Sequence, residues 1–183
     1  MIEIVNFSDK FSEVKKIKLH NFVDSRGELS KIYTNNEIKK IVPKIDEVYF
    51  SNSKKGVIRG IHFQRSPYAL TKLVTCVSGK IIDLFIDLRK KSKTFGSYET
   101  IELSDTNNLG LIIPKGFGHG YSVISESATV LYCQSGEYNK DFEDGINPLS
   151  LEIDWGTDNI VISEKDKSLP NFNNTDERFY LDE

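Results

Sequence analysis

The sequence predicts an all-β fold, a jelly-roll barrel with a few short peripheral helices. Short runs rich in β-branched and aromatic residues recur about every ten residues along most of the chain. Segments containing Gly, Pro, Ser, Asn or Asp separate these runs, and little of the chain has the periodicity of an amphipathic helix. Many short strands at this spacing are typical of sandwiches and barrels, and the mouth of a barrel can hold a small-molecule site.

The composition fits one ordinary globular domain. A chain of 183 residues can bury a sizeable core, and we expect a single domain over residues 1–183. The net charge of −3 gives no argument for nucleic acid or a membrane as partner. Cys76 and Cys133 stand in apolar runs and are expected to be core thiols of a reducing compartment. Because no signal peptide and no bilayer-spanning segment is recognisable, we expect the protein in the cytoplasm.

The N-terminal part of the chain predicts a hairpin, a short helix and a further strand. The hairpin turn contains Gly27, which can supply the positive φ that tight turns require. The helix is bounded by residue types that favour helix ends. The expected elements are strands 17–23 and 28–33 joined by the turn 24–27, a helix over 36–42 capped by Asn35 or Asn36 and stopped by Pro43, and a strand over 46–53.

The central stretch, residues 57–88, is where the chemistry is expected. Ser66-Pro67 and Ser78-Gly79 divide it into three runs, which predicts three adjacent antiparallel strands. Period-2 alternation places His62 and Lys72 on apolar faces of their strands. Either residue alone is more often structural, but a buried amine is costly unless it is paired or neutral. Two such residues on expected neighbouring strands suggest a shared chemistry.

The rest of the chain continues the strand pattern and then changes character. Strands are expected at 98–103 and 128–138, and between them residues 109–113 lead from a polar turn at 105–108 into Pro114. His119 stands between two glycines just before a further strand, a place where the backbone approaches another group closely. Residues 140–183 are polar and rich in turns, and we expect them to wrap over the barrel with a short helix.

The candidate polar residues favour acid–base chemistry without a metal. Gln64, and not a second histidine, stands two residues after His62, and the chain has three histidines in all. Neither a glycine-rich phosphate loop before a helix nor a Gly-x-Ser-x-Gly motif occurs. General acid–base catalysis by His, Tyr and Lys is left, and no cofactor is expected. The candidates are Arg59, His62, Lys72, His119, Tyr132, Tyr138, Glu143 and Asp166.

These residues lie in segments that resemble the nucleotide-sugar 3,5-epimerases of the cupin superfamily, typified by the dTDP-4-dehydrorhamnose 3,5-epimerases. The resemblance keeps its order and spacing over residues 17–170, and it implies a cupin jelly-roll barrel. The matching segments are Asp24-Ser25-Arg26-Gly27, KKGVIRGIHFQ at 54–64, Lys72-Leu73-Val74, Ile86-Asp87-Leu88-Arg89, SKTFG at 92–96, IPKGFGHGY at 113–121, Tyr132, Ile153-Asp154-Trp155 and Ser163-Glu164-Lys165-Asp166.

The resemblance implies epimerisation at C3 and C5 of a nucleotide-linked 4-keto-6-deoxy sugar for cell-surface polysaccharide synthesis. A C4 ketone acidifies the neighbouring C–H bonds, so catalysis needs a base, an acid on the opposite face and a cation near the enolate oxygen. By position, His62 is the base and Asp166 orients it. Lys72 stabilises the enolate oxygen and Tyr132 returns the proton. Substrate binding is assigned to Arg26, Arg59, His119, Tyr138, Glu143, Lys165 and Gln64.

Two structural expectations accompany these roles. Strict alternation turns Arg59 away from His62, so the assignment predicts a β-bulge at Gly60 that brings both side chains inside. The resemblance also implies a homodimer in which N-terminal strands, about residues 1–50, are exchanged between subunits.

Other functions stay open from the sequence. A C3-only epimerase acting on a GDP-, CDP- or dTDP-linked 4-keto sugar would use the same base. A 3,4-ketoisomerase of the same fold typically has a second histidine shortly after the first, and Gln64 argues against it. A non-catalytic carbohydrate-binding barrel would have no use for Lys72 and Tyr132 on apolar faces.

The sequence departs from the family pattern at several positions near the expected nucleotide. Glu28 and Leu29 replace aromatic residues after the hairpin glycine, and Lys31 replaces an acidic one. Glu47-Val48-Tyr49 replaces the usual Gln-Asp-Asn. The acid–base set is intact, so the reaction type is expected to be retained, whereas GDP- or CDP-linked substrates, including heptoses, are alternatives to dTDP.

Overall fold

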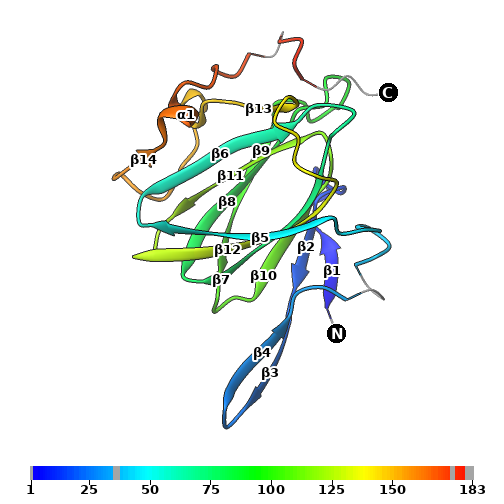
Figure 1. The fold of residues 1–183 in the computed structure, drawn as a ribbon, viewed down its shortest axis with the longest axis vertical. Coiled ribbons are helices and arrows are strands. Elements are labelled where there is room, and N and C mark those ends of the chain that lie inside the picture. Colours follow the sequence, from blue (N-terminus) through cyan, green and yellow to red (C-terminus); the bar gives the residue numbers. More distant parts are fainter. Residues whose placement is uncertain (1, 35–37, 174–175, 180–183) are drawn as a thin grey trace.

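The computed structural model describes residues 2–34, 38–173 and 176–179. Two mainly antiparallel sheets face each other and close a barrel, and a separate hairpin projects from it (Figure 1). This confirms the all-β barrel prediction. The first sheet contains, in spatial order, β1 (Glu3–Asn6), β2 (Lys15–Lys18), β10 (Leu109–Ile113), β7 (Thr71–Ser78), β12 (Ser127–Ser135) and β5 (Glu47–Lys54).

The second sheet carries the C-terminal segment along one edge. Its strands, in spatial order, are β13 (Glu143–Gly145), β6 (Val57–Gln64), β11 (Phe117–Val123), β8 (Lys80–Asp87) and β9 (Tyr98–Ser104). The short β14 (Val161–Ile162) pairs in parallel with β6 and leads into α1 (Glu164–Lys167). A 3₁₀ turn, Pro148–Ser150, lies between β13 and β14. None of the helices in the described ranges is long and apolar enough to cross a membrane.

Alternation along the strands builds separate cores inside and outside the barrel. On β8, Ile81 and Phe85 belong to the interior core, whereas Leu84 and Ile86 pack outward with Trp155. The outer core of this sheet is therefore covered by the chain that follows β13. The outer face of the first sheet is covered instead by the turn that contains Ile38 and Val42.

The three central runs are strands, but the prediction that they are adjacent is wrong, since none of them pairs with another. β6 belongs to the second sheet and β7 to the first, while β8 returns to the second. Residues 65–70 therefore carry the chain across the barrel mouth instead of forming a tight hairpin. His62 and Lys72 consequently approach one another from opposite sheets, because each side chain points inward from its own sheet.

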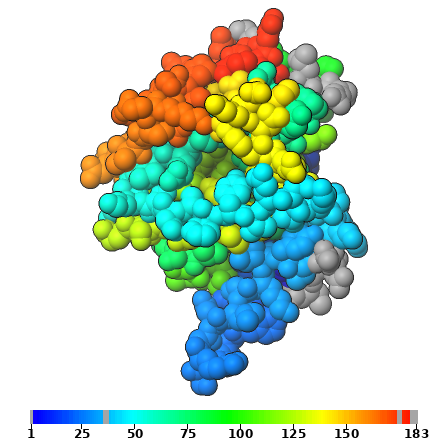
Figure 2. All heavy atoms as spheres, viewed as in Figure 1, coloured from blue at the N-terminus to red at the C-terminus, as the bar shows by residue number. Residues whose placement is uncertain are grey.

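Local predictions near the N-terminus also need correction. The expected strand 17–23 is divided at Leu19 into β2, which joins the barrel, and β3 (His20–Asp24), which pairs with β4 (Gly27–Lys31) and leaves it. Figure 2 shows this hairpin standing out from the body of the molecule. Residues 38–42 form hydrogen-bonded turns in place of the expected helix, and Asn35 and Asn36 lie outside the described residues. The strand expected to reach residue 138 ends at Ser135.

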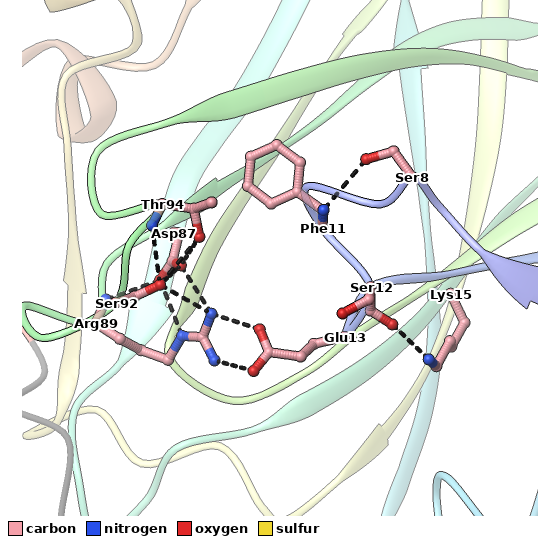
Figure 3. A network of polar contacts seen from close by, with 9 residues as sticks. All are labelled: Ser8, Phe11, Ser12, Glu13, Lys15, Asp87, Arg89, Ser92 and Thr94. Carbon is pink, nitrogen blue, oxygen red and sulfur yellow. Dashed lines mark hydrogen bonds and ion pairs between the residues drawn. The ribbon is translucent and has the colours of Figure 1, made fainter.

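A buried polar cluster fastens the loop after β8 (Figure 3). Asp87, with no exposed surface, accepts hydrogen bonds from Arg89, Ser92 and Thr94. Arg89 also makes two short bonds, of 2.7 and 2.6 Å, to Glu13 in the N-terminal loop. Burial raises the pKa of Asp87, but these donors outweigh it and hold the pKa below its usual value. The cluster thus ties two distant segments to the barrel.

Candidate active site

The bulge expected at Gly60 is present, and it sets the geometry of β6. In the pairing with β11, Arg59 lies opposite Tyr121 and His62 opposite His119, with a register shift between them. Gly60 has φ 113°, and a Cβ there would lie 2.6 Å from the Gly120 Cα, so the close approach requires glycine. Both Arg59 and His62 consequently line the same cavity.

His62 forms a hydrogen-bonded pair with Asp166. The Nε2–Oδ1 distance is 2.7 Å, and the carboxylate also receives the Gly60 N–H at 3.4 Å. Burial raises the pKa of Asp166, but the bond and charge of His62 outweigh it and the net pKa is lowered. An ionised carboxylate behind the ring is suited to orienting an imidazole that takes up a proton.

The position of Asp166 follows from local structure. The parallel pairing of β14 with β6 brings the chain alongside the bulge, and Ser163 then caps α1 by accepting a bond from the Asp166 N–H at 3.0 Å. This short turn directs the Asp166 carboxylate at His62, although 104 residues separate them in sequence.

Lys72 and Tyr132 reach the site from the facing sheet. Burial lowers the pKa of Lys72 to about 8, and the charges of Glu143 and Asp83 limit the shift. Tyr132, on the neighbouring strand β12, is 7% exposed, and burial raises its pKa well above the usual value. At neutral pH the site therefore offers an ammonium and a protonated phenol opposite the His62 ring.

A second histidine–aspartate pair lies beside the first. His119 Nε2 is 2.9 Å from Asp83 Oδ2, and both residues are buried. The other Asp83 oxygen has no hydrogen-bond partner in the described structure. Burial raises the pKa of Asp83, opposed by His119 and by the charge of Lys72. The His119 ring also meets Tyr132 edge to face, at 5.9 Å and 78°.

Three of the predicted binding residues contact one another at the rim. Glu143 Oε2 accepts hydrogen bonds from the Tyr138 hydroxyl at 2.8 Å and from Lys165 Nζ at 2.7 Å. Burial raises the pKa of Glu143, but Lys165 and Tyr138 outweigh it and the net pKa is lowered. Tyr138 and Lys165 are exposed, so the charged rim is open to a ligand.

Gln64 lines the cavity but its amide is engaged elsewhere. Its nitrogen donates to the backbone oxygens of Tyr68 and Glu137, at 2.7 and 3.2 Å, and its oxygen accepts from Asn139 N at 2.6 Å. These bonds hold the loops on either side of the mouth. A buried amide saturated by backbone groups is better suited to shaping the site than to binding substrate.

Arg26 is the predicted binding residue that the fold does not bring to the site of its own chain. It lies at the tip of the β3–β4 hairpin, is 88% exposed at its side chain and pairs with Asp24 at 2.6 Å. The hairpin projects away from the barrel in Figure 1. Within one chain, Arg26 therefore cannot take part in the constellation around His62.

Two adjoining cavities, of about 330 and 300 Å³, occupy the barrel mouth, and Tyr49, His62 and Lys72 line both. The first also contacts Glu47, Gln64, Gln134, Tyr138 and Glu143, and the second contacts Ser51, Arg59, His119, Tyr132, Lys165 and Asp166. Cationic groups gather in the second cavity. Nowhere in the described ranges do three or more His, Cys, Asp or Glu side chains come together as metal ligands could.

The structure adds site residues that the sequence analysis missed. Asp83 could have been found, because it shares the inward face of β8 with Ile81 and Phe85, where a carboxylate is out of place. Tyr49 and Glu47 stood out as departures from the family pattern, but without an inferred place in the cavity. Gln134 carried no recognisable signal in sequence.

Comparison with known proteins agrees with this arrangement. A family described as dTDP-4-dehydrorhamnose 3,5-epimerase matches residues 8–174. The dTDP-4-dehydrorhamnose 3,5-epimerase of Shigella flexneri is 39% identical over 150 residues, covering 79% of this chain and 83% of the relative. A dTDP-4-dehydrorhamnose 3-epimerase of Streptomyces niveus is 39% identical over 126 residues, covering 68% of this chain and 61% of the relative.

A solved structure extends the similarity over the entire chain. The crystal structure of dTDP-6-deoxy-D-glucose-3,5-epimerase from Legionella pneumophila, in complex with dTDP-4-keto-L-rhamnose, has a TM-score of 0.92 and 30% identity, and the match covers 100% of both chains. With its barrel, its site and its sequence in agreement, this protein belongs to the dTDP-4-dehydrorhamnose 3,5-epimerase family.

Proposed function

We propose that the protein epimerises C3 and C5 of a dTDP-linked 4-keto-6-deoxy sugar through an enolate. The observation that carries the proposal is the convergence of two sheets on one site. His62, backed by Asp166, enters from the second sheet, and Lys72 and Tyr132 enter from the first. A flat enolate between them has a base on one face and a proton donor on the other.

Each step of this mechanism is assigned to one side chain of the site. His62 donates its Nε2–H to Asp166, so its other ring nitrogen, Nδ1, removes the proton from the carbon beside the ketone, and the electron pair moves to the ketone oxygen. Lys72, whose pKa of about 8 leaves it mainly an ammonium at neutral pH, stabilises that oxygen. The Tyr132 phenol then protonates the opposite face of the carbon, and both groups return to their starting states by exchange with solvent.

Binding follows the distribution of charge around the mouth. Arg59, His119 and Lys165 line the cationic cavity and would hold the diphosphate. Tyr138 and Glu143 line the adjoining cavity and would hold the nucleoside, and the sugar would lie where His62 and Lys72 line both cavities. The saturated hydrogen bonds of Gln64 support the wall of this cavity instead of a direct contact.

The nucleotide is proposed to be dTDP. The relatives and the complex described above carry dTDP in their names, which favours it over the GDP and CDP alternatives. Glu28 and Leu29 lie on the projecting hairpin, and Glu47 lines the cavity. These departures from the family pattern therefore bear on how the nucleobase is held. Calorimetry with dTDP, GDP and CDP would test the choice, and tight binding of GDP or CDP alone would overturn it.

The reaction itself is tested by solvent exchange. The protein is incubated in D₂O with the dTDP-linked 4-keto-6-deoxy sugar, and the products are read by mass spectrometry and NMR. Deuterium at both C3 and C5 with inversion at both supports the proposal. A folded protein that binds the sugar nucleotide but exchanges neither position would be a carbohydrate-binding barrel, and Tyr132→Phe would then bind and behave like the wild type.

A C3-only epimerase is the second candidate. The Streptomyces niveus relative is named a 3-epimerase and is as similar in identity as the Shigella flexneri 3,5-epimerase. The same base serves both outcomes, since the orientation of the sugar decides whether C5 also reaches His62. Deuterium at C3 without any at C5 in the same experiment would establish this alternative.

We further propose a homodimer in which the β3–β4 hairpin reaches the partner's site. The hairpin exposes Phe22, Val23 and Leu29 at 49%, 75% and 57%, which is costly for an isolated surface. Exchange would also bring Arg26 to the diphosphate. Light scattering should give a dimer, and a monomer at assay concentration would contradict it.

Mixing two inactive variants tests the exchange itself. In a heterodimer of Arg26→Ala and His62→Asn, one site would combine the intact Arg26 of one subunit with the intact His62 of the other. Refolding the two variants together should therefore restore part of the activity. Without exchange, Arg26→Ala alone would keep its activity, because Arg26 does not reach the site of its own chain, and mixing would restore nothing further.

For its place in the cell, we propose the cytoplasm and the synthesis of a cell-surface polysaccharide sugar. Both cysteines are free and buried, in keeping with a reducing compartment.

A further inference from the structure

Tyr49 is the aromatic residue that covers Tyr132. The two are register partners on β5 and β12. Their rings are stacked, with centroids 4.8 Å apart and 12° between planes. β5 is the edge strand of its sheet, and Tyr49 is 41% exposed whereas Tyr132 is 7% exposed. The outer ring therefore shields the inner one from the open side of the barrel.

The hydroxyl of Tyr49 is anchored to the cavity wall. It donates to Gln134 Oε1 at 3.2 Å, and the Gln134 amide nitrogen donates to Glu47 Oε2 at 2.8 Å. The other Glu47 oxygen accepts the Tyr138 N–H at 2.9 Å. Gln134 is buried, so this chain of bonds holds the Tyr49 ring from its far end.

Tyr132 is thus confined on two sides. Tyr49 lies flat against one face, and the His119 ring meets it edge to face at 5.9 Å. His119 is in turn fixed by Asp83 at 2.9 Å. Tyr49 also lines both cavities together with His62 and Lys72, so its ring stands at the point where the sugar would lie.

We propose that Tyr49 is a positioning residue for the return of the proton by Tyr132. It decides how often the enolate is protonated on the face opposite His62, which inverts the carbon, instead of on its original face, which restores the substrate. This rests on the proposed function, because it requires Tyr132 to be the acid. The stacked ring keeps the phenol aimed at the face of the enolate opposite His62. Without it, Tyr132 can turn toward the open edge, and His62 returns a proton to the face from which it came.

The consequence is a change in how the enolate divides between inverted product and restored substrate, which a loss of folded protein would not produce. His62 exchanges its abstracted proton with solvent in either case, so restored substrate carries deuterium when the reaction is run in D₂O. A misplaced Tyr132 lowers inversion but leaves this exchange. The ratio of inverted product to deuterated, unchanged substrate therefore reports the position of Tyr132 and not the amount of folded enzyme.

The test compares Tyr49→Leu and Tyr49→Phe with the wild type. Tyr49→Leu removes the stacked ring and should lower the inversion-to-exchange ratio about 10-fold or more, since a 1 Å misplacement can cost on the order of 10²-fold. The loss should appear in kcat, with KM changed less than about 3-fold. Tyr49→Phe keeps the ring and loses the anchor to Gln134, so its ratio should stay within about 3-fold of the wild type.

Phe50→Leu is the matched control, because Phe50 is the next residue on β5 and is 63% exposed on the outer face. Its ratio should equal that of the wild type. If Tyr49→Leu folds poorly by circular dichroism, Tyr49→Met, whose flexible side chain adapts to an irregular gap without an aromatic face, must show the same change.

An unchanged ratio in a folded Tyr49→Leu or Tyr49→Met would overturn the positioning role while the wild type still epimerises. If the wild type incorporated no deuterium, both the proposed function and this inference would be contradicted.

Discussion

Asp83 and Asp87 lie four residues apart on β8, and neither has exposed surface, yet their surroundings differ. Asp87 is surrounded by donors from Arg89, Ser92 and Thr94, and its pKa is lowered in spite of burial (Figure 3). Asp83 has His119 on one oxygen, and no residue that the structure describes bonds the other; burial raises its pKa. The first arrangement stabilises the barrel, and the second keeps an incompletely satisfied charge beside the site.

The difference distinguishes Asp87, a carboxylate that stabilises the fold, from Asp83, a carboxylate that serves the site. A buried charge with all its partners costs little, whereas an under-satisfied one costs stability that selection tolerates chiefly at functional sites. Asp83 faces Lys72, whose pKa it helps to keep near 8 against burial. The matched substitution of Asn at the two positions should therefore separate stability from activity.

The largest effect is expected from Asp87→Asn, as a loss of stability. Removing one partner of a buried ion pair costs about 3–5 kcal/mol, because Arg89 loses its buried partner. Urea denaturation should show this as a lower midpoint with the slope unchanged, while KM of the remaining folded enzyme is retained. Asp158→Ala, an exposed carboxylate, serves as control and should change stability by less than about 0.5 kcal/mol.

Acid denaturation sharpens the same comparison. Since the folded pKa of Asp87 is lowered, its stabilisation is present above the unfolded value of about 3.9 and is lost as pH falls through the folded value. Asp87→Asn should flatten that loss. The raised pKa of Asp83 has the opposite sign, so the folded state gains relative stability as pH falls toward it. If both variants gave parallel acid limbs, the contrast between the two carboxyls would be wrong.

Asp83→Asn is expected to affect activity more than stability. Asparagine can keep a hydrogen bond to His119 but removes the charge near Lys72. We expect exchange at C3 to fall about 10-fold, less than the roughly 10²-fold cost of deleting an oxyanion donor itself, with stability unchanged or higher. A folded variant with full activity would show that the second histidine–aspartate pair is structural.

The pH dependence of the reaction should report Lys72. As pH rises through about 8, the ammonium loses its proton and kcat/KM for exchange should fall. Burial keeps Tyr132 protonated throughout this range, so it does not account for the fall. Lys72→Arg, which stays charged, should be slower but should lack this alkaline limb. A limb that persists in Lys72→Arg would assign it to another group.

The smallest effect is expected at the rim. Lys165 is 60% exposed at its side chain and bonds Glu143 at 2.7 Å, so the pair contributes little to stability after solvent screening. Lys165→Ala should raise KM a few-fold, on the order of one exposed ion pair with a phosphate, with kcat unchanged. Lys167→Ala, whose partner Glu164 faces solvent, is the matched control and should leave KM as it was.

Local pattern was sufficient for the parts of the fold that depend on one strand at a time. Alternation along residues 57–88 placed His62 and Lys72 inward, and Gly60 predicted the bulge that returns Arg59 to the same side. The pattern could not say which sheet each strand would join. The segment 65–70 resembled a hairpin connection, but it crosses the barrel mouth.

The candidate site divides in the same way. The identities of His62, Lys72, Tyr132 and Asp166 as a possible set came from the sequence, whereas Asp83 and Tyr49 entered with the structure. Asp83 is notable for an oxygen that no described residue bonds. Tyr49 is notable because its ring stacks on Tyr132, which lies on another strand. Neither property is local to the residue.

The sequence by itself determined the all-β class, the inward face of each strand and the types of chemical group available to the site. Tertiary structure alone decided that His62 and Lys72 face each other from opposite sheets, that Asp166 reaches His62 over 104 residues, and that Arg26 stays outside its own site. The physical reason is that period-2 alternation specifies a side of a strand, while the neighbour across the barrel depends on long-range pairing and packing that no short segment contains.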